Sequence, residues 1–115
     1  MPTTEEKIQQ QLDEHPIIIY MKGTPKFPQC GFSGHAVKFL SATGIDYAYV
    51  NVLEAPAIYE RLPGFSQFPT FPQVFIGGEL VGGSDIVEEL ANNGELAPMM
   101  EAAIAKSAAA SGAAS

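Results

Sequence analysis

"PIIIYMKGTPKFPQCGFSGHAVKFL" (residues 16–40) joins a short apolar run, a proline-containing loop and a helical pattern. The run at 17–21 is continuous and rich in β-branched residues, which is typical of a strand covered on both faces. After the loop, apolar side chains recur at helical spacing between Phe32 and Leu40. A second apolar run follows at 47–52. Strand, helix and strand in this order predict a parallel pair with a right-handed crossover.

Two more helices are predicted from residues typical of helix ends. Thr3 stands three residues before Glu6, which is capping-box spacing, and Pro16 is placed to end this N-terminal helix. Pro56 occupies a position suited to the first turn of a helix over 55–62.

The second half of the chain predicts a hairpin. Short strands at 74–76 and 79–81 flank the glycine pair 77–78, which suits a tight primed turn. Together with the parallel pair, this hairpin predicts an α/β domain with a four-stranded mixed sheet and helices on both faces.

The C-terminal part begins with another capping pattern, because Asp85 stands three residues before Glu88 at the start of a predicted helix. A last helix is expected over 95–106. Residues 107–115 are low-complexity Ala, Ser and Gly, which we expect to be disordered. The domain is therefore expected to span 1–106.

Composition narrows the function. The 115 residues suffice for one domain, and the formal net charge of −7 disfavours nucleic acid as a partner. No apolar run is long enough to suggest a membrane span, and the polar, acidic start differs from a secretory signal. One cysteine allows no internal disulfide. We therefore expect a cytoplasmic protein without a membrane partner.

The single cysteine, Cys30, is the first candidate site residue. A lone cysteine is more often a small buried core residue than a reaction centre. Here it stands at a predicted helix N-terminus, where N–H groups and the helix dipole favour a thiolate. Lys22 and Lys26 bring positive charge nearby, and Gly31 leaves space beside the sulfur. These features favour a reactive or metal-ligating thiol.

Two further motifs can serve structure or ligand binding. Thr70, Phe71 and Pro72 form either a plain strand entry with proline or an extended edge that pairs with a peptide. Gly83 and Ser84 precede Asp85 as an ordinary helix cap or as an anion site built from exposed N–H groups. A short thiol peptide with a carboxylate at each end, such as glutathione, matches the thiol, the edge and the anion site.

The motifs "MKGTPKFPQCGFS" (21–33), "FPTFPQVFIGGELVGG" (68–83) and "SDIVEEL" (84–90) resemble those of monothiol, CGFS-type glutaredoxins of the single-domain bacterial kind. The resemblance runs from about residue 4 to residue 105 and implies a thioredoxin fold.

The resemblance implies a role for each candidate residue. Cys30 is the active-site thiol, and Lys22 contacts a glutathione carboxylate. Phe71, beside a cis Pro72, pairs with the glutathione backbone, and residues 83–85 hold the other carboxylate.

Two positions depart from the family pattern. Tyr59 stands where close relatives often have an arginine, and Arg61, two residues further on, faces another side of its helix. Ser84 replaces a second cysteine that many relatives carry.

The resemblance also implies a [2Fe–2S] cluster, used in cluster storage or transfer and in iron homeostasis. Two irons usually take four thiolates, and this chain has one. A homodimer with two glutathiones supplies four, with Cys30 as the metal ligand in each subunit. His35 is a possible iron ligand by its chemistry, but its place within a helix favours an exposed, unrelated role.

The competing function is a glutathione-dependent thiol–disulfide oxidoreductase. Ser33 stands where a dithiol enzyme has its second cysteine, so only a monothiol route of deglutathionylation is open. The resemblance implies that this activity is weak at most. It also implies BolA-like proteins and apo iron–sulfur proteins as partners.

Overall fold

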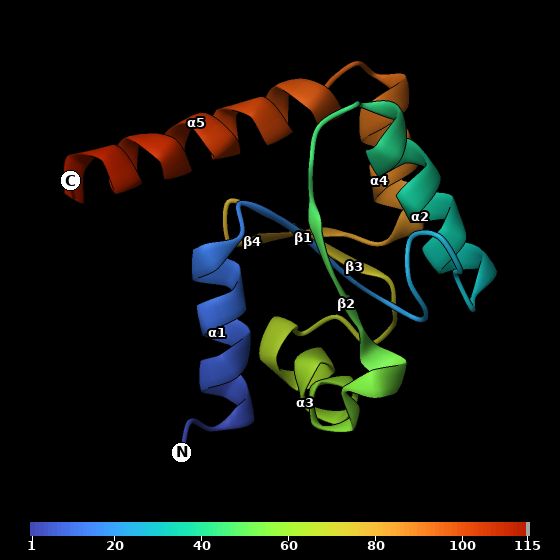
Figure 1. Ribbon diagram of the computed structural model, residues 1–115. Coiled ribbons are helices and arrows are strands. Elements are labelled where there is room, and N and C mark those ends of the chain that lie inside the picture. The colour runs from blue at the N-terminus through green and yellow to red at the C-terminus, as the bar shows by residue number, and fades with distance from the viewer. Residues whose placement is uncertain (115) are drawn as a thin grey trace.

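A computed structural model describes residues 1–114, with a four-stranded mixed sheet between two layers of helices (Figure 1). The strands are β1 (Ile17–Met21), β2 (Ala48–Asn51), β3 (Gln73–Ile76) and β4 (Glu79–Gly82), in the order β2-β1-β3-β4. β1 runs parallel to β2 and antiparallel to β3, and β3 and β4 form the hairpin. The predicted sheet is confirmed.

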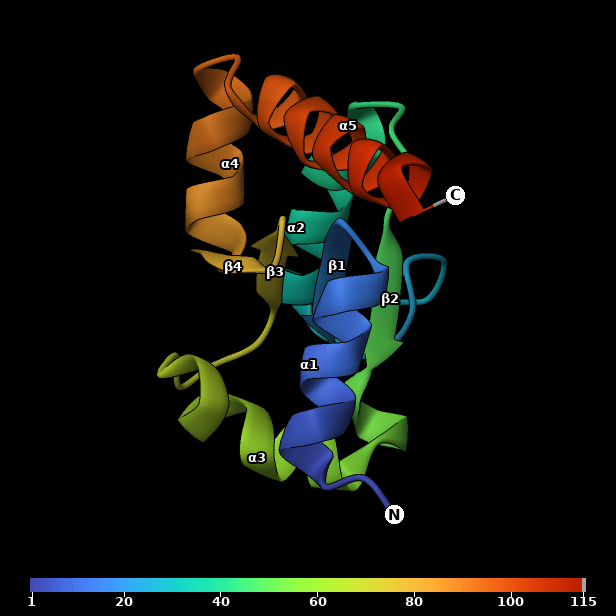
Figure 2. The ribbon, with the colours of Figure 1, turned by 90° about the vertical axis from the view of Figure 1, so that its left-hand side faces the viewer.

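The helices are α1 (Thr4–Glu14), α2 (Gly31–Ala42), α3 (Pro56–Ser66), α4 (Ser84–Asn92) and α5 (Leu96–Ala114), with a 3-10 turn at Val52–Glu54. In Figure 1, α1 and α3 lie on one side of the sheet, and α2 and α4 lie on the other. Figure 2 shows α5 crossing the end of the sheet where β1 and β2 begin.

β1 separates two hydrophobic cores. All five of its side chains are buried, and they alternate between the two faces of the sheet. Ile17, Ile19 and Met21 pack in one core with residues of α2, α4 and α5. Ile18 and Tyr20 pack in the other core with residues of α1 and α3. This double burial explains why the run is continuously apolar.

The N-terminal signals of α1 and α4 differ in outcome. The capping box of Thr3 and Glu6 is formed in both directions. α4, in contrast, begins at Ser84 with Gly83 at the N-cap, so the prediction that Asp85 caps this helix is wrong. Asp85 lies inside the first turn, because the chain leaves β4 and enters the helix two residues earlier than the capping spacing suggests.

α3 and α5 are longer than predicted. α3 continues past Pro63 to Ser66. α5 continues past Lys106 to Ala114, so the backbone of 107–114 is helical where the sequence predicts none. Alanine has the highest intrinsic helix propensity, which offsets the signal of low complexity. The domain boundary at residue 106 stays a prediction. None of the helices in the described part of the chain is long and apolar enough to cross a membrane.

Candidate active site

Cys30 occupies the N-cap of α2 at the end of the sheet where β1 finishes. Its backbone is extended, and its side chain makes no capping hydrogen bond. The residue is partly exposed, and a Cβ built on the neighbouring Gly31 would meet no atom within 4 Å. The sulfur therefore lies at a helix start with open space beside it, so another molecule can approach closely.

The environment lowers the pKa of the Cys30 thiol below its ordinary value. The main cause is the backbone N–H of Ser33, and partial burial opposes it. The backbone N–H of Phe32, the charge of Lys22 and the hydroxyl of Ser33 lower the pKa further. These N–H groups are the ones that an α-helix leaves unpaired in its first turn. The thiol is thus prepared for ionisation chiefly by the helix start.

Ser33 links the thiol to the preceding strand. It is fully buried, and its Oγ accepts a hydrogen bond from the backbone N–H of Lys22 at 3.1 Å. The hydroxyl proton is then available to the Cys30 sulfur, in agreement with the direction of the pKa shift. The residue that replaces a second thiol is therefore an internal hydrogen-bonding group of the site.

An ordered loop carries the chain from Lys22 to Cys30. The N–H of Gln29 donates to the Lys22 carbonyl at 2.9 Å and closes the loop. Gly23, with φ +96°, leaves no room for a side chain, since a Cβ would lie 2.5 Å from the Phe27 carbonyl oxygen. The N–H of Gly23 donates at 2.9 Å to Oδ1 of Asn51, which lies at the end of β2. Sequence reasoning missed Asn51, because its partner is 28 residues away along the chain.

Lys22, Tyr59 and Phe71 come together from three parts of the chain. The Lys22 Nζ lies 5.5 Å from the centroid of the Tyr59 ring. The Tyr59 and Phe71 ring centroids are 5.2 Å apart, with the rings tilted by 47°. Lys22 acts on the Cys30 thiol through its charge, and the ring of Tyr59 lies between the contacts to Lys22 and to Phe71.

In the segment before β3, residues 68–72, some backbone groups are hydrogen-bonded by a side chain and others make no hydrogen bond. The peptide bond between Phe71 and Pro72 is cis. Nε2 of the buried Gln73 donates to the carbonyl of Phe68 at 2.8 Å and to that of Thr70 at 3.2 Å. Within residues 1–114, the backbone N–H and carbonyl of Phe71 make no hydrogen bond. The segment therefore keeps free backbone groups at Phe71, and Gln73 is a second positioning residue that the sequence did not reveal.

The start of α4 lies against this same segment. A Cβ on Gly83 would lie 3.3 Å from the Pro72 carbonyl oxygen, so the two backbones are close neighbours. No side chain caps α4, which leaves the N–H groups of its first turn free for an anion. Ser84 is buried and Asp85 is exposed.

Other polar residues from the sequence analysis have separate partners. Arg61 pairs with Glu5 of α1 at 3.1 Å, on the side of α3 away from Tyr59. His35 pairs through Nε2 with Glu88 of α4 and packs edge-on against Phe39. Lys26 is exposed on the loop, and the charge that acts on the thiol is that of Lys22. The described residues contain no group of three or more potential metal ligands of the His, Cys, Asp or Glu type.

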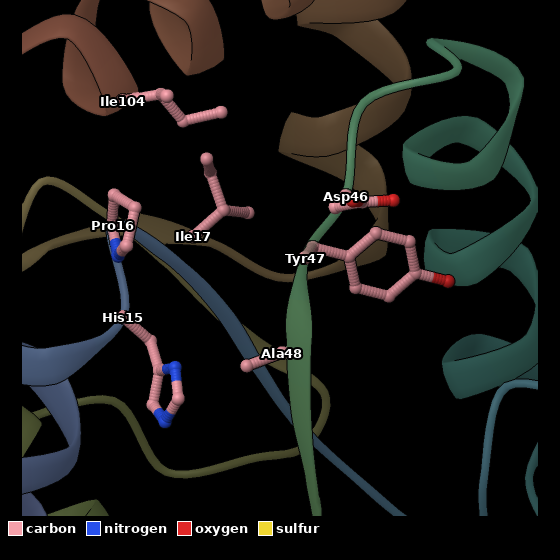
Figure 3. Close-up of a pocket in the computed structure, with 7 residues that line it drawn as sticks. All are labelled: His15, Pro16, Ile17, Asp46, Tyr47, Ala48 and Ile104. Carbon is pink, nitrogen blue, oxygen red and sulfur yellow. The ribbon is translucent and has the colours of Figure 1, made fainter. Parts of the chain in front are cut away.

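A cavity of about 460 Å³ lies at the opposite end of β1 and has a different character (Figure 3). Its lining is mostly apolar, and its polar groups do not converge. In Figure 3 the Tyr47 ring points towards α2, where its hydroxyl hydrogen-bonds Ser41 at 2.8 Å. The His15 ring lies across the cavity from it. The lining residues are His15, Pro16, Ile17, Asp46, Tyr47, Ala48 and Ile104.

Comparison with known proteins identifies the family. The glutaredoxin family model matches residues 17–81, which include Lys22, Cys30 and residues 70–72 and end just before residues 83–85. The chain belongs to the glutaredoxin family. This glutaredoxin is 52% identical over 106 residues to glutaredoxin 4 of Escherichia coli strain K12, with 92% of each chain covered.

Two other relatives sharpen the assignment. A probable monothiol glutaredoxin of Legionella pneumophila is 56% identical over 88 residues, covering 76% of this chain and 99% of that one. The crystal structure of a buckwheat glutaredoxin–glutathione complex aligns with a TM-score of 0.76 and 28% identity, covering 89% and 96% of the two chains. The protein is therefore a monothiol glutaredoxin with the predicted thioredoxin fold, and Cys30 is its one thiol.

Proposed function

We propose that this glutaredoxin binds glutathione along the surface formed by Lys22, Phe71 and the start of α4, with the glutathione sulfur next to Cys30. The observation that carries the proposal is the convergence of the thiol, a cation and an uncapped helix start around free backbone groups. Lys22 would pair with one carboxylate of the peptide. The first-turn N–H groups of α4 would hold the other.

The free backbone groups of Phe71 complete this binding mode. An extended peptide gains affinity by adding to an unpaired backbone edge. The N–H and carbonyl of Phe71 are available, while Gln73 fixes the residues just before them. The buckwheat glutaredoxin crystallised with glutathione supports the same ligand here.

The function that this site supports best is the carriage of a [2Fe–2S] cluster between two subunits. One chain has one thiolate, and two irons take four, so two chains and two glutathiones match the requirement. The surroundings of Cys30 fit such a cargo, because the sulfur faces open space next to Gly31. Phe27 and Phe32 flank it with exposed fractions of 72% and 65%, which offers apolar surface for a second subunit.

The alternative is deglutathionylation by Cys30 alone. The Cys30 thiolate attacks the glutathione sulfur of a mixed disulfide, a new disulfide forms, and the protein substrate leaves as a thiolate that takes a proton from water. A second glutathione thiolate then attacks, releases glutathione disulfide and restores the Cys30 thiolate. The lowered pKa of Cys30 favours this chemistry.

The partners belong to the same proposal. Cluster storage and transfer, with a contribution to iron homeostasis, require apo iron–sulfur proteins as recipients, and a BolA-like protein is the further candidate. A cytoplasmic site of action fits, because the free thiol and glutathione both depend on a reducing environment.

Anaerobic reconstitution tests whether cluster carriage or deglutathionylation is the main function. The protein is incubated with iron, sulfide and glutathione, and its visible absorption and native mass are recorded. We expect a coloured dimer with two glutathiones, and a colourless product when glutathione is omitted. Cys30→Ser removes the thiolate and should abolish the colour, whereas Ser41→Ala, at the other end of α2, should not.

Two results would overturn the ranking. The first is a colourless monomer that rapidly deglutathionylates a model substrate, which would favour the oxidoreductase. The second is a cluster that survives Cys30→Ser, because the chain would then hold iron through other groups.

A further inference from the structure

Tyr59 connects two elements of the site without any charge of its own. Its ring lies under the Lys22 ammonium, with 5.5 Å between Nζ and the centroid, and packs against Phe71 at 5.2 Å. A cation within about 6 Å of a tyrosine ring is attracted by the negative face of the π system. The lysine at the end of β1 is thus tied to α3 and to the segment before β3.

Among the described residues, the Lys22 ammonium contacts the Tyr59 ring and forms no ion pair. Its backbone N–H is bound to Ser33, but the ammonium sits on a flexible four-carbon stem. Glu5 of α1 is paired with Arg61 on another side of α3. Tyr59 is 38% exposed and Lys22 is partly exposed, so this pair lies at the surface where a ligand can reach it.

We propose that Tyr59 is a positioning residue that holds Lys22 over the site and so prepares it to receive a carboxylate of the ligand; this rests on the glutathione site proposed above. A side chain that is already held loses less conformational entropy when it pairs. The ligand then meets a cation at a defined place over the Tyr59 ring. Tyr59 itself does not need to contact the ligand for this effect.

A double-mutant cycle with S-methylglutathione as the probe tests the inference. The probe keeps both carboxylates but forms no disulfide and offers no thiolate to iron. Its dissociation constant is measured by calorimetry for the wild type, Tyr59→Leu, Lys22→Met and the double variant. We expect Tyr59→Leu to weaken binding about two- to fivefold, the range of an exposed cation–π contact. In the Lys22→Met background the same change should have no further effect.

Three controls separate this role from a structural one. Tyr59→Phe keeps the ring and should bind within about twofold of the wild type. Tyr49→Leu removes another exposed tyrosine, on β2, and should leave the dissociation constant unchanged. Thermal unfolding of each variant checks folding. In NMR spectra the ε-methylene protons of Lys22 should show an upfield ring-current shift in the wild type and Tyr59→Phe, but not in Tyr59→Leu.

The outcomes distinguish the two proposals. An equal loss of affinity from Tyr59→Leu with and without Lys22 would overturn the positioning role, since Tyr59 would then act through Phe71 or by direct contact. Unchanged binding by Tyr59→Leu would overturn it as well, while the glutathione site stands. A wild-type protein that does not bind S-methylglutathione would overturn the glutathione site itself.

Discussion

The two ends of β1 differ in what they offer to another molecule. At the end where β1 starts, an open cavity of about 460 Å³ is lined mainly by apolar groups, including Ile104 of α5. At the end where β1 finishes, a thiol, a lysine and an uncapped helix start lie together. One end of β1 therefore has an apolar cavity, and the other end has the groups that can bind or react with a ligand.

The difference follows from the topology. Loops that leave β1 and enter β3 meet at one end, because these strands are antiparallel neighbours, and α4 starts from the same end after β4. Ligands of α/β proteins favour the carboxyl ends of the parallel strands for this reason. The opposite end carries the hairpin turn and the start of β1 and β2, which α5 covers (Figure 2).

The largest expected effect is a contrast between two glycines with positive φ. Gly23→Ala, at the site end, would place a Cβ 2.5 Å from the Phe27 carbonyl oxygen, which cannot yield without moving the loop. Gly78→Ala, in the hairpin turn at the other end, meets no atom within 4 Å. We expect a loss of unfolding free energy of about 3–5 kcal/mol for the first and about 1–2 kcal/mol for the second. Urea unfolding measures both, and equal losses would show that the loop adapts to a side chain.

The next contrast uses two serines of α2. Ser33→Ala leaves the partly buried N–H of Lys22 without its acceptor and should cost about 1–3 kcal/mol. Alkylation of Cys30 by iodoacetamide at neutral pH should also slow, because the hydroxyl no longer lowers the pKa of the thiol. Ser41→Ala removes an exposed hydrogen bond to Tyr47 at the far end and should change neither quantity much. A normal alkylation rate in Ser33→Ala would show that the Ser33 hydroxyl does not lower the pKa of the Cys30 thiol.

A smaller effect is expected when the positive charge of Lys22 is removed, because this charge lowers the pKa of Cys30. The rate of Cys30 alkylation should rise with pH and reach half its maximum below pH 9.0, the ordinary pKa of the thiol. Lys22→Met should move this midpoint upwards, since the positive charge favours the thiolate. Lys106→Met, on α5 at the other end, should leave it in place. A midpoint that Lys22→Met does not move would restrict the cause to the helix start.

The same shift predicts a pH dependence of stability. The pKa of Cys30 is lower in the folded protein than in the unfolded chain, so ionisation favours the folded state. This contribution is fully present above the unfolded-state pKa and is lost as the pH falls through the folded-state pKa. Cys30→Ser, which cannot ionise in this range, should show no such contribution when unfolding is measured from pH 6 to pH 10.

The smallest effect on the site is expected from a substitution in the lining of the cavity at the other end of β1. Ile104→Ala removes part of the lining and, because Ile104 is only partly buried, should cost about 1 kcal/mol of unfolding free energy. The rate of Cys30 alkylation should not change. A changed rate would show that the two ends of β1 are coupled through the sheet, which would weaken the distinction between them.

Much of the fold was predictable from local pattern. The run at 17–21 indicated a strand buried on both faces, and the capping box of Thr3 and Glu6 set the start of α1. Prediction failed where a local signal competed with another, as at the N-cap of α4 and in the alanine-rich part of α5. There the exit from β4 and the helix propensity of alanine outweighed the spacing and composition rules.

The main residues of the candidate site were predictable from the sequence, but the contacts between them were not. Cys30 and Lys22 stand out in a chain with one cysteine and six basic residues. The support by Asn51 was not visible, because its partner Gly23 is 28 residues away along the chain. Gln73 bonds residues only three and five positions before it, but no capping or turn spacing marks this side chain. The same holds for the pairing of His35 with Glu88, 53 residues apart.

By itself the sequence determined which elements form and which chemistry is available, since helix caps, strand runs and a lone thiol depend on neighbouring residues. Only the tertiary structure decided that Lys22 lies over Tyr59, that Arg61 turns to Glu5, and that Gly83 touches Pro72. These contacts join elements that the β2-β1-β3-β4 sheet brings to one end. Their geometry depends on how strands pair and helices cross, and on side-chain directions that spacing along the chain does not specify.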